Sequence, residues 1–206
     1  MTTVVRIEVS PVSWWRPLVQ WLLCIPHLLL TGAMAVASVA IAFLIAPIVL
    51  LTGKAPARLV AFQVTSLRER VRCYAYFFVL RESRPPYALA PRLRDPADDP
   101  LVEVSASPPE RMSRWALLAR PFVVLPHLLV LVPIGVVMDV CYPVWMLLVA
   151  ANRGWPAGLE RLLIQIEAWV TAVALYALFV TDEAPRFGMA AYGDPVAARP
   201  PLPSSR

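Results

Sequence analysis

The side chains best suited to chemistry are two histidines and one aspartate that interrupt long apolar runs. His27 and His127 are the only histidines, they stand 100 residues apart, and each directly follows a proline. Asp139 is the only charged residue between positions 121 and 151. Ionisable groups within apolar runs of this length mark ion pathways, proton relays or ligand sites in membrane proteins. These three residues are therefore the intramembrane polar candidates of the chain.

Three roles are open to the histidine pair. Two imidazoles related by a twofold axis could bind a haem iron from both sides, because histidine is a common axial ligand. They could instead bind another metal or relay protons. The interpretation that we favour is structural: His27 and His127 each donate a hydrogen bond that orders a segment in which proline has freed a carbonyl. On that interpretation the chain has no cofactor and no metal site.

Motifs of the common enzyme classes are missing from the sequence. It contains only 7 glycines, and no phosphate-binding loop or dinucleotide fingerprint occurs among them. Neither an HExxH zinc motif nor a nucleophile elbow is present. Because both histidines lie in apolar runs, we do not expect a catalytic triad of the soluble type. We predict that the protein is not an enzyme and has no catalytic residue.

Composition points to a membrane protein. Of the 206 residues, 59% are apolar and 16% are charged, and the mean hydropathy is +0.63. A soluble domain has about 45–50% apolar and about 25% charged residues. The three cysteines are too few for the disulfide framework of a small secreted domain. We therefore predict an integral membrane protein.

The charge distribution indicates how this protein meets the bilayer. There are 19 basic and 14 acidic residues, and the net charge is +5. The basic residues gather beside the apolar runs, as do residues that face anionic lipid headgroups. We predict a bilayer with anionic headgroups and one or more membrane proteins as partners, and no nucleic acid. We expect a multi-pass protein of the bacterial cytoplasmic (inner) membrane with both termini in the cytoplasm.

The sequence contains an internal duplication, visible as similar segments in the same order about 100 residues apart. The clearest pair is Ile25–Leu29 and Leu125–Leu129, which read IPHLL and LPHLL. Further pairs are Ser13–Arg16 with Ser113–Trp115, Pro56–Leu59 with Pro156–Leu159, Phe78–Glu82 with Phe179–Glu183, and Val5–Ser10 with Leu101–Ser105. We predict a first membrane repeat (1–90), a Pro/Asp-rich connector (91–100), a second membrane repeat (101–190) and a disordered Pro-rich tail (191–206).

The order of these features resembles a bacterial family of membrane domains of unknown function that is common in tandem copies in actinobacteria. The resemblance covers about residues 4–89 and 101–189 and includes the Thr-Gly-Lys/Arg-x-Pro turn of that family. Thr52–Pro56 fits the turn, whereas the second copy departs from it and reads ANRGWP at 151–156. The resemblance implies a tandem membrane architecture and no reaction.

Each repeat is expected to hold a short strand, a long apolar segment and an amphipathic helix, which makes the fold class all-α with minor β. Residues 17–51 carry no charge, and one helix of this length would reach about 52 Å, against a hydrocarbon core of about 30 Å. We favour helical hairpins with turns near Thr31-Gly32 and near Pro133-Ile134-Gly135. The alternative is one long span kinked at Pro26. In a hairpin, Asp139 lies near the headgroups as a turn residue, which we favour, and a proton or ion relay is the alternative.

The segment after the first apolar run has the periodicity of an amphipathic helix in the interface plane. Its apolar stripe comprises Val60, Val64, Leu67, Val71, Tyr74 and Phe78. The opposite stripe comprises Arg58, Thr65, Arg68, Glu69, Arg72 and Tyr76. The basic residues Arg58, Arg68, Arg70 and Arg72 could contact anionic lipid or form ion pairs with Glu160 or Glu167 of the second copy, and both alternatives stay open. The alternating segments Val5–Val9 and Leu101–Val104 are strand-like and could pair into a small sheet.

These features favour a function that depends on association. We expect an accessory or scaffold subunit of a membrane complex, or a membrane-organising factor. A transport or lipid-handling protein with a path between the two repeats is the alternative, and a haem-binding electron-transfer protein is a weaker one.

Overall fold

The computed structural model describes residues 4–7, 9, 12–93, 99, 101–106 and 108–192. The fold is mostly helical and contains two short strands. In chain order, the elements are β1 (Val4–Ile7), α1 (Arg16–Thr52), α2 (Ala57–Phe77), β2 (Val102–Ser105), α3 (Arg114–Val140), α4 (Tyr142–Asn152), α5 (Ala157–Ala177) and a 3-10 helix η1 (Met189–Tyr192). Most of the predicted Pro-rich tail, from residue 193, lies outside the described residues.

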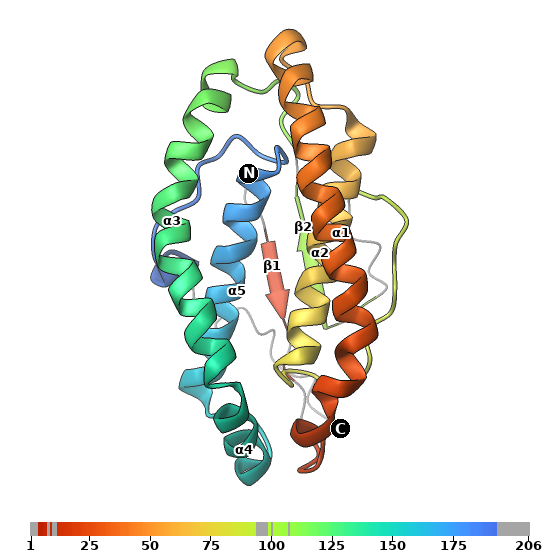
Figure 1. Cartoon of the computed structure of the whole chain (residues 1–206), viewed down its shortest axis with the longest axis vertical. Coiled ribbons are helices and arrows are strands. Elements are labelled where there is room, and N and C mark those ends of the chain that lie inside the picture. Colours follow the sequence, from red (N-terminus) through yellow and green to blue (C-terminus); the bar gives the residue numbers. More distant parts are fainter. Residues whose placement is uncertain are drawn as a thin grey trace, which may run out of the picture.

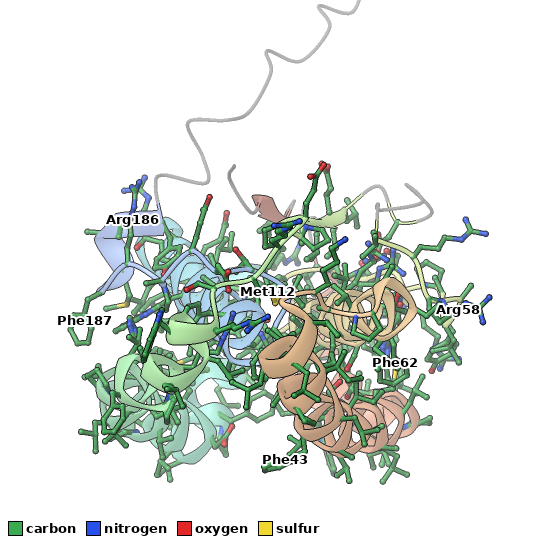
Figure 2. The ribbon with its side chains drawn as sticks, turned by 90° about the horizontal axis from the view of Figure 1, so that it is seen from above. Phe43, Arg58, Phe62, Met112, Arg186 and Phe187 are labelled. Carbon is green, nitrogen blue, oxygen red and sulfur yellow. The ribbon has the colours of Figure 1, made fainter. Side chains whose placement is uncertain are left out.

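The elements form three layers. Figure 2 shows α1 and α3 side by side as one outer layer, α2 and α5 behind them, and the two strands on the opposite side. Helices α1 and α3 run antiparallel, so the start of α3 lies beside the end of α1 (Figure 1). There the Met112 amide donates to the Gly53 carbonyl at 2.9 Å. The middle layer is therefore enclosed from both sides.

The predicted hairpins are wrong. Helix α1 runs without a break through Thr31 and Gly32. The Thr31 hydroxyl donates to the His27 carbonyl at 2.9 Å, so this threonine is bonded within the helix and does not start a turn. Helix α3 likewise passes through residues 133–135 and ends at Val140. The alternative of one long helix holds for the first apolar run, which forms a helix of 37 residues that contains Pro26.

The second apolar run is interrupted only at Cys141, between α3 and α4. The Cys141 amide donates to the Val137 carbonyl at 2.9 Å, and Pro143 follows in the first turn of α4, where its missing amide costs nothing. Asp139 therefore lies in the last turn of α3 and not beyond a hairpin turn.

Both helices of the middle layer end in the same way. Val79, after α2, has φ 56°, and Phe179, after α5, has φ 62°. These left-handed residues let the next amide turn back, so that Leu80 donates to the Ala75 carbonyl at 2.9 Å. Val180 donates to the Leu175 carbonyl, also at 2.9 Å. Left-handed backbone is costly for β-branched and aromatic residues, so surrounding contacts must hold both ends.

The two strand-like segments pair into a two-stranded antiparallel sheet, as predicted. Ile7 lies opposite Val102, and Val5 lies opposite Val104. The buried side chains of Ile7, Val102 and Val104 pack with Val71 of α2 in the largest apolar cluster. The sheet thus covers the side of α2 that faces away from α1.

Helix α2 is confirmed, but most of its polar stripe faces the protein interior. The predicted polar stripe is buried: Thr65, Arg68, Glu69, Arg72 and Tyr76 are almost inaccessible, and only Arg58 is exposed. The reason is the third layer, which supplies partners from distant sequence. One guanidinium nitrogen of Arg68, for example, donates to the Val104 carbonyl of β2 at 3.2 Å. A lipid-headgroup role for Arg68 and Arg72 is therefore wrong.

Candidate functional site

His27 lies on a buried polar stripe of α1 that faces α2. The stripe comprises Gln20, Cys24, His27, Thr31 and Ser38. The imidazole is 2% exposed, and its Nε2 lies 3.4 Å from a carboxylate oxygen of Glu69 on α2. On its other side the ring packs at 4.9 Å between centroids against Tyr87. His27 is thus held between α2 and the segment that follows it.

Glu69 connects His27 to a buried network of charges. Its second oxygen accepts from Arg72 at 2.8 Å, and Arg72 Nε lies 3.5 Å from Asp99. Arg81 Nη1 lies 2.5 Å from the same Asp99 oxygen. The two carboxylates and two guanidinium groups neutralise each other, which is the condition for keeping such groups out of water. The Pro/Asp-rich connector therefore contributes a buried carboxylate, since Asp99 is 4% exposed.

His127 has a different set of partners in the second half. It is 4% exposed, and its Nδ1 accepts a hydrogen bond from the Trp169 indole at 2.9 Å. Its ring packs against Phe187 at 5.2 Å between centroids. Because Nδ1 is an acceptor, the proton of the neutral ring lies on Nε2.

The two histidines are therefore not brought together. Each packs on an aromatic residue of its own half, and no contact joins the two imidazoles in the part of the chain that the structure describes. Among the described residues, His27 lies beside the Glu69 carboxylate and His127 accepts from the Trp169 indole, and neither forms the hydrogen bond to a carbonyl freed by proline that we favoured. A haem held between His27 and His127 is not the arrangement seen. Among the described residues there is no group of three or more metal-binding side chains.

Two further polar residues cap the middle helices, and sequence reasoning missed both. Gln20 Nε2 donates to the carbonyls of Tyr76 at 2.7 Å and Arg81 at 2.8 Å. Arg120 donates to the carbonyls of Tyr176 and Thr181. These bonds satisfy carbonyls that a helix end leaves without partners. The sequence signal was a polar residue near the start of each apolar run: Gln20 lies within the first run, and Arg120 directly precedes the second.

For Arg70, the alternative of an ion pair between the halves is the one that the structure shows. Arg70 of α2 donates to the two Glu167 oxygens of α5 at 2.6 and 3.3 Å, and to the Thr171 hydroxyl at 3.0 Å. Burial raises the pKa of Glu167 to about 7, against the opposing effect of Arg70. Glu160, the other predicted partner, is half-buried in the first turn of α5.

A cavity of about 660 Å³ lies between the two halves, next to this ion pair. Its wall is mainly apolar and comes from α1, α2, α3 and α5. The polar side chains that line it are Thr31, Arg70, Cys73, Tyr74, Asp139 and Glu167. Neither histidine belongs to the wall. The cavity therefore joins Asp139, Arg70 and Glu167 in one site and leaves His27 and His127 outside it.

Burial raises the pKa of Tyr74, whose hydroxyl donates to the Leu163 carbonyl at 3.4 Å. The negative charges of Glu167 and Asp139 raise the same pKa, whereas Arg70 lowers it. The three charged side chains therefore act on one common region of the cavity.

Cys24 and Cys73 are a second pair that the sequence did not reveal. Their sulfur atoms lie 3.6 Å apart at the packed interface of α1 and α2. Both thiols are free and buried. The pair marks a close approach of the outer and middle layers.

Two helices, α1 and α3, are long and apolar enough to cross a membrane by length and composition. Only 22% of the most apolar window of α1 and 11% of that of α3 is buried within the protein. An apolar core helix of a soluble domain would be mostly buried, so these two helices present an unusual amount of apolar surface. Comparisons of the chain with protein-family models, curated proteins and solved structures found no match.

Proposed function

We propose that this protein is a membrane-organising protein that lies in the plane of the bilayer, with the layer of α1, α3 and α4 embedded in one leaflet. The observation that carries the proposal is the distribution of exposed large apolar side chains. Apart from Trp14, Trp15, Tyr87, Leu89 and Phe187, all of them lie on α1, α3 or α4. Figure 2 shows the result: Phe43 points outward from this face, whereas Arg186 lies on the opposite side.

Charged residues on the side opposite the apolar layer argue against an orientation in which this chain crosses the bilayer without a partner protein. Arg84, Arg92, Glu103 and Arg186 are exposed on the third layer. If α1 stood along the membrane normal, this layer would enter the bilayer beside it, and each charge at the bilayer centre would cost about 2.5–3.5 kcal/mol. Helix α1 has 37 residues and would extend about 55 Å, well beyond a core of about 30 Å. An in-plane orientation avoids both penalties.

Basic residues at the ends of the apolar layer fit this orientation. Lys54 and Arg114 are exposed where α1 ends and α3 begins, and Arg153 is exposed where α4 ends. Arg58 follows on α2 and points away from the core (Figure 2). Cations in these positions attract anionic headgroups by about 1 kcal/mol each. The proposed lipid partner is therefore a leaflet that contains anionic lipid.

The proposed tandem architecture has structural support from pairs of residues 100 positions apart. Gln20 and Arg120 cap equivalent helix ends, and His27 and His127 pack on Tyr87 and Phe187. Gly53 and Arg153 both end their helices with a positive φ. We propose that the chain consists of two copies of one unit of the actinobacterial type, related by an approximate twofold axis through the sheet. Such a unit needs no catalytic chemistry to act on a membrane.

A multi-pass arrangement with α1 and α3 across the inner membrane is the competing topology. It would require a membrane protein to cover the charged third layer, so the crossing topology and the role of accessory subunit belong together. The two alternatives differ in where the ends of α1 lie. In the in-plane orientation both ends face the same aqueous compartment, which for the proposed inner-membrane protein is the cytoplasm.

Single cysteines distinguish these topologies. Trp14→Cys and Lys54→Cys, at the two ends of α1, are placed in a background in which Cys24, Cys73 and Cys141 are replaced by alanine. Sealed vesicles of known orientation are then treated with a membrane-impermeant maleimide. The in-plane proposal predicts that both positions, and Arg186→Cys as a marker of the third layer, are labelled from the same side. Labelling of positions 14 and 54 from opposite sides would overturn it.

A further inference from the structure

We propose that the cavity between the two halves binds one membrane lipid, with an acyl chain along its apolar wall and a primary ammonium headgroup at Asp139. The inference rests on the bilayer location proposed above. It adds a specific ligand site and the chemical class of its ligand.

The size and lining of the cavity fit a lipid chain. Ligand pockets have volumes of about 300–1,000 Å³ and combine apolar walls with a few placed polar groups. The cavity has about 660 Å³, and its wall includes Leu131, Met138, Ile166, Val170 and Val173. An empty apolar space of this size beside a bilayer would be filled by the apolar molecules that surround it.

The entrance of the cavity opens on the lipid-facing layer. Leu28, Leu128 and Val132 line the cavity and are also 40%, 44% and 58% exposed on α1 and α3. The cavity wall is therefore continuous with the apolar face. A chain from the leaflet can enter between α1 and α3 without crossing polar surface.

The charges at the cavity indicate the headgroup. Arg70 is occupied by Glu167 and Thr171. Asp139 is exposed on the apolar layer, and no cationic side chain pairs with it among the described residues. The cavity thus has one surplus negative charge at its lipid-facing end. A carboxylate in such a position is stabilised by a cation that enters with the ligand.

A primary ammonium suits this carboxylate better than other headgroups. It carries three N–H donors, which can form charge-assisted hydrogen bonds with both Asp139 oxygens. A trimethylated choline has no such donor, and a glycerol headgroup has no cation. We therefore expect an ethanolamine lipid to bind more tightly than a choline or a phosphatidylglycerol lipid with the same chains.

The test is native mass spectrometry of the full chain released from nanodiscs that contain ethanolamine, choline and glycerol phospholipids in equal amounts. We expect one bound lipid per protein and a preference for the ethanolamine lipid of about tenfold, the ratio that corresponds to one charge-assisted hydrogen bond. Asp139→Asn should remove the preference and keep a bound lipid. Absence of a retained lipid, or equal retention of all three headgroups by the unmodified protein, would overturn the inference.

Two glycines provide a matched pair of variants for the chain position. Gly135 lines the cavity, and a Cβ built on it meets no atom within 4 Å. Gly32 of α1 also has nothing within 4 Å but does not line the cavity. Gly135→Phe should reduce the bound-lipid fraction about tenfold, because the phenylalanine side chain occupies space in the cavity and removes the apolar contacts of acyl-chain methylene groups there. Gly32→Phe should leave the bound-lipid fraction unchanged. Equal retention in both variants would contradict the assignment.

The thermal transition of both phenylalanine variants, followed by circular dichroism, shows whether they fold. Failure of the lipid site can also be distinguished from failure of the proposed membrane orientation. If positions 14 and 54 label from opposite sides while Gly135→Phe loses lipid, the orientation fails and the site stands. If they label from one side and no lipid is retained, the site fails alone.

Discussion

Gln20 and Arg120 lie 100 positions apart and bind corresponding carbonyls at the ends of two different helices. Gln20 donates to the Tyr76 and Arg81 carbonyls, and Arg120 donates to those of Tyr176 and Thr181. The amide group of Gln20 and the guanidinium group of Arg120 thus both donate hydrogen bonds to carbonyls at a helix end. The difference is that Arg120 also bonds to Asp182 at 2.5 Å and lies over the rings of Tyr176 and Phe179.

This relationship predicts which substitutions the helix ends tolerate. Gln20→Leu leaves two buried carbonyls without donors and should lower the free energy of unfolding by about 1–3 kcal/mol for each group left unsatisfied. Arg120→Gln keeps an amide donor and should cost less than Arg120→Leu. Unfolding in a mild detergent, followed by circular dichroism, measures the order. Equal losses for the two Arg120 variants would show that the carbonyl bonds contribute little.

The ion pair between the halves predicts a pH-dependent effect. Arg70→Ala leaves the Glu167 carboxylate, which is 1% exposed, without its cation. We expect a loss of about 1–3 kcal/mol, the cost of an unsatisfied buried group, because Arg70 itself is 31% exposed and partly screened by water.

The sign of the pH effect follows from the raised pKa of Glu167. Burial raises this pKa to about 7 with Arg70 present, and removal of Arg70 raises it further. The Arg70→Ala variant tolerates a protonated, neutral Glu167 better than a charged one. Its loss of unfolding free energy relative to the unmodified protein should therefore be smaller at pH 5.5 and should grow as the pH rises to 8. The double variant Arg70→Ala, Glu167→Gln should recover stability and lose this pH dependence. A deficit that is constant with pH would mean that Glu167 stays neutral throughout.

Glu82 gives the opposite sign at the surface. Hydrogen bonds from Ser13 at 2.9 Å and from Arg16 at 3.1 Å lower the pKa of Glu82. Its contribution to stability is present above the ordinary carboxyl range and is lost as the pH falls through the lowered pKa of the folded state. Glu82→Gln should therefore flatten the acid limb of the stability profile. The exposed Glu110→Gln is the control and should leave that limb unchanged.

The Cys24 and Cys73 thiols predict a specific crosslink. Because their sulfur atoms lie 3.6 Å apart, treatment of the membrane-embedded protein with an oxidant such as diamide should join α1 to α2 by a disulfide. The product is identified by mass spectrometry after proteolysis. Cys73→Ala should abolish it, and Cys141, which has no sulfur partner in the described chain, should not replace it. A crosslink that includes Cys141 instead would contradict the packing of α1 on α2.

The sequence predicted the elements better than their environments. The pairing of the two strands and helix α2 followed from local periodicity. The hairpins did not occur, because an uncharged run of 35 residues is compatible with one helix or two and contains no strong signal for a turn at Thr31. For the polar stripe of α2, the sequence left headgroup contact and internal pairing open, because its partners Asp99 and Val104 lie some 30 residues further along the chain.

For the candidate site, too, some contacts could be predicted from the sequence and others could not. The pairing of Arg70 with Glu167 was one of two alternatives that the sequence offered, because both helices carry charged residues beside apolar stripes. The partners of His27 and His127 could not be predicted, because they depend on which side of α1 and α3 faces the middle layer. The lining of the cavity could not be predicted either, since its wall takes residues from four helices whose spacing no local pattern records.

The pairing of Ile7 with Val102 has a consequence for how the protein is made. Strand β1 leaves the ribosome first, but its partner β2 follows almost a hundred residues later, as do the Asp99 carboxylate and the Val104 carbonyl that satisfy Arg72 and Arg68. During synthesis the Arg72–Glu69 ion pair can form within the first half, whereas the contacts of Arg72 with Asp99 and of Arg68 with Val104 form only after these later residues emerge. A chain truncated at residue 90 would lack the strand that pairs with β1 and the later groups that contact Arg68 and Arg72.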